Sequence, residues 1–203
     1  MAQTAAKNVE SVTIWVREPE LVDAINKQHR NTLYLPDVLL SDRITATNDL
    51  NVCLDGAEAV LLTVPAQFLR AVCKQLSTVW KQGLPAVVCA KGIEQKTGAL
   101  MSEMLAETLP QAPLALLSGP TFAEEVALEK PTLVTLACAD EKLGKKLVET
   151  LGTSTFRPYY TPDVVSVQIG GAVKNVMAIA AGIVAGKKLG DNARAALITR
   201  SLA

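Results

Sequence analysis

Two lysines stand in contexts that suit chemistry. Lys91 directly follows an apolar run in VVCAKGIEQ, and Lys174 interrupts a run of small and apolar residues in GGAVKNVMAIAAG. An ammonium group offers a point charge to a phosphate or a carbonyl oxygen, and a lysine that has lost part of its solvation can donate or accept a proton. Each lysine also has an ordinary interpretation. Lys91 could be a surface residue of a loop, and Lys174 could lie at a helix edge with its ammonium in water.

A turn further along the chain offers an anion site. In LALLSGPTFAEEV, the residues SGPT separate an apolar run from a helical pattern. Thr121 and Glu124 have the spacing of a capping box, in which the Thr121 side chain accepts a hydrogen bond from the Glu124 amide. Gly119 would let the backbone approach a ligand closely. The segment therefore predicts a helix start, with an anion site above it as the functional interpretation.

Arg17 and Glu18 end an apolar segment, IWVREPE. In dinucleotide folds, an acid after the second strand binds the ribose 2′-hydroxyl, whereas an arginine there accommodates a 2′-phosphate. The pair is therefore compatible with NAD or NADP as cofactor, and a solvated turn is the alternative. Asn175, beside Lys174, is either a polar helix residue or a ligand contact.

Alternating strands and helices must position these residues. Nearly unbroken apolar runs predict strands buried on both faces, at residues 11–16, 59–64, 86–90, 114–118 and 132–137. Apolar residues at helical spacing lie between them, at 18–29, 65–80, 97–109 and 140–151. The alternation predicts an α/β fold with a doubly wound, parallel, Rossmann-type sheet. Ligands of such sheets bind beyond the carboxyl ends of the strands, where Lys91 and Gly119 fall.

The alternation stops at RPYYTPDVV (157–165), and two long helical patterns follow. We expect a dinucleotide-binding domain at residues 1–157 and the start of an all-helical substrate-binding domain at residues 158–203. The sequence contains neither the first strand nor the G-x-G-x-x-G turn of a dinucleotide fold, and it ends inside a helical pattern without a C-cap glycine. We therefore expect an internal piece of a longer enzyme, truncated in both domains and inactive by itself.

Composition narrows the function classes. The sequence has 20 basic and 20 acidic side chains, so neither nucleic acid nor an anionic membrane is favoured as a partner. The uncharged stretch 175–186 is shorter than the roughly 20 residues of a transmembrane helix, so no membrane span is predicted. Four cysteines without a C-x-x-C pair, and no visible signal peptide, favour a cytoplasmic location. A single histidine, His29, argues against the usual catalytic triads and histidine-rich metal sites, and no metal is expected.

Four segments, in this order and spacing, carry a resemblance to a known family. CAKG, LSGPTFAEEVA, YYTPDVVSVQIGGAVKNVMAIAAGI and GDNARAALITR closely resemble the bacterial NAD(P)-dependent glycerol-3-phosphate dehydrogenases. The resemblance covers essentially the whole chain, and SGPTFA together with GGAVKN is highly specific. It implies a dinucleotide-binding domain joined to an all-helical substrate domain. The implied reaction is reversible hydride transfer between NAD(P)H and dihydroxyacetone phosphate, giving sn-glycerol 3-phosphate for glycerophospholipid synthesis.

The resemblance also implies roles for residues around the substrate. Lys174 matches the lysine that donates or accepts the proton at the substrate oxygen. Gly119 and Thr121 match substrate contacts, and we place Asn175 with them beside Lys174. The expected partner is therefore a small phosphate, dihydroxyacetone phosphate or sn-glycerol 3-phosphate.

Three positions match cofactor contacts by the same resemblance. Lys91 matches a lysine that touches both cofactor and substrate, Ala123 matches a cofactor contact, and Arg17 matches the position at the adenosine ribose. The family's first strand, glycine-rich turn and later helices have no counterpart in the sequence.

Two other functions stay open. A 3-hydroxyacid or 6-phosphogluconate-type dehydrogenase shares the two-domain plan and a helix lysine, but SGPTFAEEV argues against it. A non-catalytic dinucleotide-binding or scaffold module is the alternative from a different class. The apolar helices after residue 165 would need a partner surface if left uncovered, and a homodimer is one way to supply it.

Overall fold

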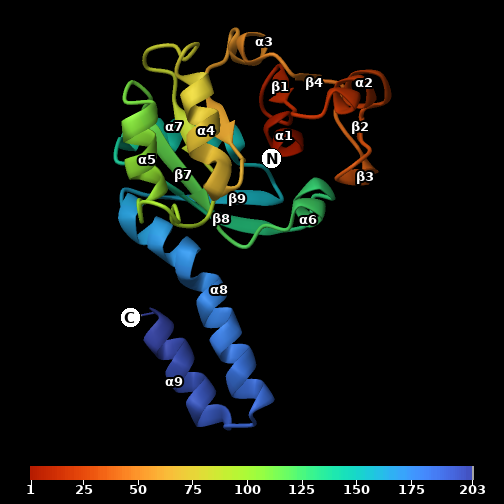
Figure 1. The fold of residues 1–203 in the computed structure, drawn as a ribbon. Coiled ribbons are helices and arrows are strands. Elements are labelled where there is room, and N and C mark those ends of the chain that lie inside the picture. Colours follow the sequence, from red (N-terminus) through yellow and green to blue (C-terminus); the bar gives the residue numbers. More distant parts are fainter. Residues whose placement is uncertain (203) are drawn as a thin grey trace.

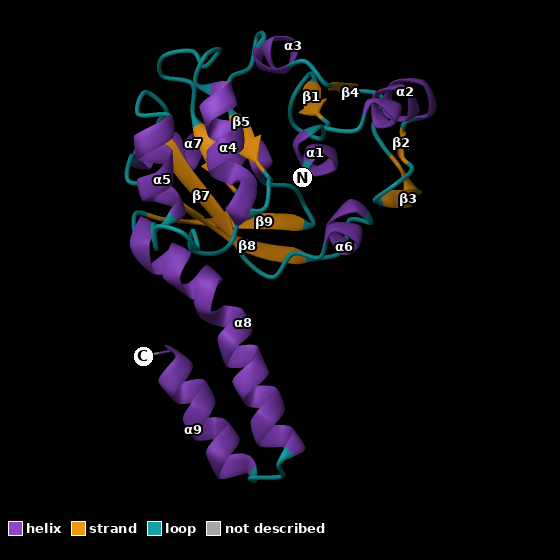
Figure 2. Ribbon diagram, in the orientation of Figure 1, coloured by secondary structure: helices purple, strands orange, loops and turns teal. Residues whose placement is uncertain are grey.

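Five strands form one continuous mixed sheet in the computed structural model, which describes residues 1–202 (Figures 1 and 2). In spatial order they are β5 (Val60–Leu62), β6 (Ala86–Val88), β7 (Leu114–Ser118), β8 (Thr132–Ala137) and β9 (Phe156–Thr161). β5, β6 and β7 run parallel, β8 is antiparallel to β7, and β9 is parallel to β8. The predicted α/β class is confirmed, but the reversed direction of β8 makes the sheet mixed, which corrects the expectation of a wholly parallel one.

Two further strands form a separate parallel pair, β1 (Val12–Trp15) with β4 (Ile44–Thr47). Between them in the chain lies a small antiparallel hairpin of β2 (Arg30–Asn31) and β3 (Leu35–Leu39). The orders β4-β1 and β5-β6-β7 correspond to positions 3-2 and 4-5-6 of the dinucleotide-binding order 3-2-1-4-5-6. In residues 1–202 no strand occupies position 1, the place of the first strand that the sequence also lacks.

Helices cover both faces of the sheet, which explains why the parallel strands β5, β6 and β7 are almost wholly apolar. In β6, Ala86 and Val88 pack into the cluster beneath α4 (Ala66–Leu76) and α5 (Met101–Thr108), whereas Val87 packs on the opposite face with residues of α7 (Glu141–Leu151). The helices of this body are α1 (Ala2–Ala5), α2 (Pro19–Gln28), α3 (Leu50–Leu54), α4 (Ala66–Leu76), α5 (Met101–Thr108), α6 (Ala123–Ala127) and α7 (Glu141–Leu151).

The strand β9 was not expected, because its sequence FRPYYT contains a proline. β9 pairs only with β8 and is the last strand of the sheet, and an edge strand tolerates a proline that cannot donate to a neighbour. The sheet therefore continues to Thr161, and the helical part of the chain begins at Val164.

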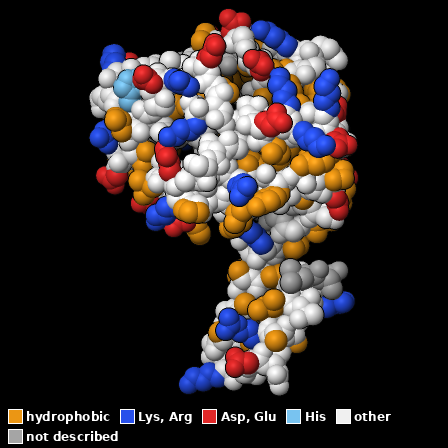
Figure 3. All heavy atoms as spheres, turned by 180° about the vertical axis from the view of Figure 1, so that it is seen from behind, with side chains coloured by type: hydrophobic (Ala, Val, Ile, Leu, Met, Phe, Trp, Pro, Cys, Tyr) orange, Lys and Arg blue, Asp and Glu red, His pale blue; other side chains and the backbone are white. Residues whose placement is uncertain are grey.

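Two long helices, α8 (Val164–Gly186) and α9 (Asp191–Leu202), form a hairpin that projects from the body (Figure 1). Val164 and Val167 pack against the cluster beneath α4 and α5. Farther out the hairpin exposes hydrophobic side chains (Figure 3), including Val176, Ile179 and Ile183 of α8.

The length of α8 bears on the sequence-based expectation that no segment spans a membrane. Lys174 does not interrupt the helix, which runs for 23 residues with a mean hydropathy of 1.6. By length and composition alone, such a helix could cross a membrane. The same properties fit a helix that other parts of a protein cover.

Close packing of α7 on β9 generates a first prediction. A methyl group added at Gly144 would lie 2.7 Å from Cδ2 of Tyr160 and 3.2 Å from Cβ of Cys138. We expect Gly144→Ala to lower the free energy of unfolding by about 1 to 3 kcal/mol in urea titrations, because overpacking outweighs the gain in helix propensity. In a Tyr160→Ala background the same substitution should raise the free energy of unfolding. A single Gly144→Ala variant with an unchanged or higher urea midpoint would contradict the packing argument.

Candidate active site

Lys91 joins the carboxyl ends of two neighbouring strands. It follows β6 by three residues, and its Nζ donates hydrogen bonds to the Gly119 carbonyl oxygen (2.5 Å) and to Thr121 Oγ1 (3.2 Å), both just beyond β7. Lys91 is half-buried, and this burial lowers its pKa; the ammonium of Lys174 lowers it further. The predicted residues Lys91, Gly119 and Thr121 therefore do meet at one edge of the sheet.

The predicted capping box does not form. The N-cap residue of α6 is Phe122, without a side-chain cap, and the helix begins at Ala123. The Thr121 hydroxyl instead accepts the hydrogen bond from Lys91, so a tertiary contact replaces the local one. Ala123, the predicted cofactor contact, lies directly after this segment.

The helix α8 passes close to the same edge. A methyl group added at Gly171 would lie 3.0 Å from Ser118 Oγ and 3.8 Å from Lys91 Cγ. Lys174 lies one helical turn farther on, near enough for its charge to act on Lys91. Lys174 and Asn175 are both exposed in the described structure, so the poor solvation expected for Lys174 is not observed; Lys91 is the more buried lysine.

Arg17 lies apart from this cluster, after the carboxyl end of β1. Its Nη2 lies 2.7 Å from Glu18 Oε1, and the Tyr34 hydroxyl donates to the same oxygen (3.1 Å). The hydrogen bond to Glu18 raises the pKa of Arg17. The guanidinium-bearing side chain is 80% exposed, whereas that of Glu18 is 19% exposed and already has two donors. The end of β1 therefore presents a cation to solvent more than a free carboxylate.

A polar network behind Lys91 was missed at the sequence level. The Arg70 guanidinium donates two hydrogen bonds to the Glu94 carboxylate (2.7 and 2.9 Å) and a third to Glu107 (2.6 Å). Thr97 donates to Glu94 as well. Hydrogen bonds from Arg70 and then Thr97 lower the pKa of Glu94 to about 2. The spacing KGIE did place an acid three residues after Lys91, but only the folded chain identifies its partner.

Gln67 fixes the same loop from α4. Its Nε2 donates to the Ile93 carbonyl (2.9 Å), and its Oε1 accepts from the Gln95 amide (3.0 Å). The segment that follows Lys91 is thus held to the body by side chains, although it contains only one isolated β-bridge, between Ile93 and Leu100.

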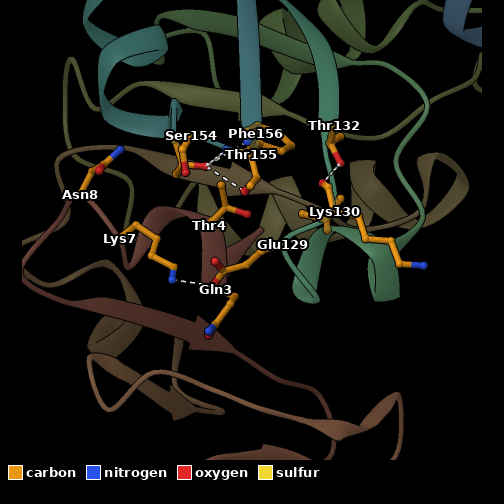
Figure 4. Close-up of a pocket in the computed structure, with 12 residues that line it drawn as sticks. Gln3, Thr4, Lys7, Asn8, Glu129, Lys130, Thr132, Ser154, Thr155 and Phe156 are labelled. Carbon is orange, nitrogen blue, oxygen red and sulfur yellow. Dashed lines mark hydrogen bonds and ion pairs between the residues drawn. The ribbon is translucent and has the colours of Figure 1, made fainter.

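A separate pocket of about 240 Å³ lies between α1, α6 and the turn before β9 (Figure 4). None of the predicted site residues lines it. Lys7 forms an ion pair with Glu129 there, and the Thr132 hydroxyl donates to the Lys130 carbonyl. Because its polar groups largely satisfy each other, this pocket offers less to an anion than the Lys91 edge does.

The residues that the structure describes contain no cluster of histidine, cysteine and carboxylate side chains that could hold a metal ion. All four cysteines are free. At the sheet edge, the ammonium groups of Lys91 and Lys174 can attract an anion.

Comparisons with known proteins converge on one family. A family model described as NAD-dependent glycerol-3-phosphate dehydrogenase N-terminus matches residues 1–144, and the corresponding C-terminus model matches residues 163–203. All 203 residues align with proteins named glycerol-3-phosphate dehydrogenase [NAD(P)+], at 58% identity in Paramagnetospirillum magneticum and 57% in Rhodospirillum rubrum. The chain spans 74% and 58% of the length of these two relatives.

A solved structure gives the same answer. The glycerol-3-phosphate dehydrogenase of Coxiella burnetii superposes with a TM-score of 0.87 at 36% sequence identity. The match covers 99% of this chain and 62% of that one.

The Arg70–Glu94 pair generates a prediction about pH. Since the folded pKa of Glu94 lies below its ordinary value of 4.5, its contribution to stability is present above pH 4.5 and is lost as the pH falls toward about 2. We expect Glu94→Gln to lower the free energy of unfolding at pH 7, and the difference from the parent chain to narrow between pH 4.5 and 2.

Glu58→Gln is the matched control, since Glu58 forms only an exposed pair with Lys146 and its removal should change little. Urea titrations at several pH values measure both variants. A Glu94→Gln deficit that is the same at pH 7 and pH 3 would show that the Glu94 charge is not the source.

Proposed function

Because the chain belongs to the NAD-dependent glycerol-3-phosphate dehydrogenase family, we propose that it is part of an enzyme that transfers a hydride between NAD(P)H and dihydroxyacetone phosphate. The product is sn-glycerol 3-phosphate for glycerophospholipid synthesis. The observation that carries this proposal is the meeting of Lys91, Gly119 and Thr121 at the carboxyl edge of the sheet, with Lys174 beside them.

The two lysines divide the work in this proposal. Lys174 donates a proton to the carbonyl oxygen of dihydroxyacetone phosphate, and accepts it back in the reverse direction. Lys91 provides a positive charge for cofactor and substrate, while Gly119, Thr121 and Asn175 contact the substrate. The bound nicotinamide would supply the hydride to the carbonyl carbon. The carbon thus gains two electrons as one C–H bond forms, and the oxygen gains the lysine proton.

The described residues fit a dinucleotide in two places. Arg17 presents an exposed cation after β1, where the adenosine ribose lies in this fold, and Lys91 with Ala123 stands near the other end of the binding edge. We propose that Arg17, Lys91 and Ala123 contact the cofactor, NAD or NADP.

We also propose the two domains expected from the sequence. The expected boundary between residues 157 and 158 falls inside β9 (Phe156–Thr161), so we extend the dinucleotide-binding domain to Thr161 and begin the helical substrate domain at α8. The exposed apolar side chains of α8 and α9 support covering by protein rather than lipid, because Val164, Val167 and the buried Gln168 already bind the first two turns of α8 to the body. The part of α8 that follows Gln168 also carries Lys174, and a charge is costly inside a bilayer. A second copy of the chain, in a homodimer, is one such covering surface.

A cytoplasmic location is part of the same proposal. Four free cysteines, of which Cys73 and Cys138 are buried, support a reducing compartment.

The role of Lys174 is testable in the full-length enzyme, by following NADH and NADPH oxidation with dihydroxyacetone phosphate. We expect Lys174→Ala to lower kcat by on the order of a hundredfold or more, because the proton donor is lost. Lys174→Arg should keep the positive charge and the affinity for phosphate but not restore kcat, since a guanidinium does not release its proton readily.

Lys187→Ala is the control, because it removes a charge from the end of the same helix, away from the sheet edge. Near-normal turnover by Lys174→Ala would refute the assigned role. A full-length enzyme that reduces NAD(P) with 6-phosphogluconate or a 3-hydroxy acid, and leaves dihydroxyacetone phosphate unreduced, would refute the proposed substrate.

A further inference from the structure

Gln168 is a buried polar residue in an otherwise exposed or half-buried helix. It is 8% exposed and is the buried residue of α8. A buried amide needs hydrogen-bond partners, and Gln168 has three. Its Oε1 accepts from the Ser102 amide (2.8 Å), and its Nε2 donates to Ser102 Oγ (3.0 Å) and to the Val164 carbonyl (3.2 Å).

The partner lies at the start of a well-packed helix. Ser102 is the second residue of α5, and the first amides of a helix have no partner within it. Gln168 supplies that partner from 66 residues away. On either side of Ser102 in α5, Met101, Met104 and Leu105 are at most 1% exposed. The two hydrogen bonds between Gln168 and Ser102 thus attach α8 to a rigid part of the body.

Residues at successive turns of α8 lead from this attachment toward the candidate site. Gly171 lies three residues after Gln168, and Lys174 lies three residues after Gly171, so each is about one turn from the last. Gln168, Gly171, Lys91 and Ser118 line a common gap between α8 and the sheet edge. The gap measures about 10 Å³, no more than one water molecule needs. The helix is therefore in close contact with the edge that carries Lys91.

We propose that Gln168 is a positioning residue for Lys174. Through its paired hydrogen bonds to Ser102, it fixes the height and rotation of α8 over the sheet edge, and so the distance between the Lys174 ammonium and the group that receives its proton. This inference rests on the proposed function, in which Lys174 is the proton donor. Without these hydrogen bonds, α8 would be held by the apolar contacts of Val164 and Val167 and by the close approach of Gly171 to the sheet edge, and such packing contacts are not directional.

A purely structural role for Gln168 makes a different prediction. It would lower stability and leave kcat unchanged in the folded protein, whereas a positioning role lowers kcat with binding of the cofactor intact. Displacements of about 1 Å in an active site can cost about a hundredfold in rate.

The test uses Gln168→Met in the full-length enzyme, because methionine keeps the volume and removes both hydrogen bonds to Ser102. Assays well below the unfolding temperature should show kcat reduced by about tenfold to a hundredfold, with the KM for NAD(P)H unchanged. Ser102→Ala removes the hydroxyl acceptor only and should give a smaller decrease. Adding Ser102→Ala to Gln168→Met should cause no further loss, because the contact is already broken.

Thr108→Val is the matched control. It removes a buried hydrogen bond to the Met104 carbonyl at the other end of α5, without touching α8, and should leave kcat unchanged. An unchanged kcat in Gln168→Met, or strictly additive losses with Ser102→Ala, would overturn the proposal.

A second measurement does not depend on turnover. Lysines labelled by reductive ¹³C-methylation can be titrated by NMR in the parent enzyme and in Gln168→Met. The titratable groups that act on Lys91 are Lys174 from α8 and Cys89 after β6. If α8 loses its position, the pKa of Lys91 should rise, because the Lys174 charge moves away. An unchanged Lys91 titration would refute the proposed positioning role of Gln168. A parent enzyme that does not reduce dihydroxyacetone phosphate would instead refute the proposed function, and the titration can be measured in either case.

Discussion

The Lys91 ammonium, half-buried at the carboxyl edge of the sheet with the charge of Lys174 acting on it, is the constraint on which the rest of the candidate site depends. Burial and the charge of Lys174 together lower the pKa of Lys91. Lys91 has neutral acceptors, the Gly119 carbonyl and the Thr121 hydroxyl, and among the described residues no ion pair neutralises either lysine. Such an edge is prepared for an anion. A phosphate ester would relieve the repulsion that the fold itself maintains.

Holding like charges close together requires supports on both sides. On the side of Lys91, two hydrogen bonds from Arg70 to the Glu94 carboxylate fix the loop that follows Lys91. Lys174 belongs to another element, and the Gln168–Ser102 contact ties that element to the body. Both supports are bidentate and join segments distant in the chain. Pairs of directional hydrogen bonds define an orientation, which the aliphatic clusters beneath them do not.

The sequence was sufficient wherever a local pattern determines structure. The runs LALLS and TLVTLA became β7 and β8 with the predicted bounds, because most of their side chains are buried or half-buried, with the exception of the exposed Leu133 in β8. Local rules failed where a tertiary partner decided. Thr121 had the spacing of a capping residue, but its hydroxyl accepts a hydrogen bond from Lys91 instead. FRPYYT forms a strand despite its proline because it is an edge strand, paired on one side only.

Lys91, Gly119 and Thr121 could be predicted as a group because strand ends bring them together, whereas Gln168 could not. A glutamine in an apolar helix gives no local sign of its partner. Arg70 and Glu94 are likewise 24 residues apart, and nothing in either segment indicates the other.

Gly170 and Gly171, which precede Lys174, bear on how α8 packs against the sheet edge. A glycine inside a helix costs about 1 kcal/mol relative to alanine, so two in succession need a reason. At Gly171 the reason is the close approach to Ser118 and Lys91, while a methyl group at Gly170 would meet open space in the described structure. The sheet edge thus requires only one of them.

Farther along α8, Val176 and Ile179 are exposed, and the same part of the helix also carries Lys174. A protein surface could cover these apolar residues and still leave the Lys174 ammonium in contact with water or an anion, whereas lipid would leave it poorly solvated.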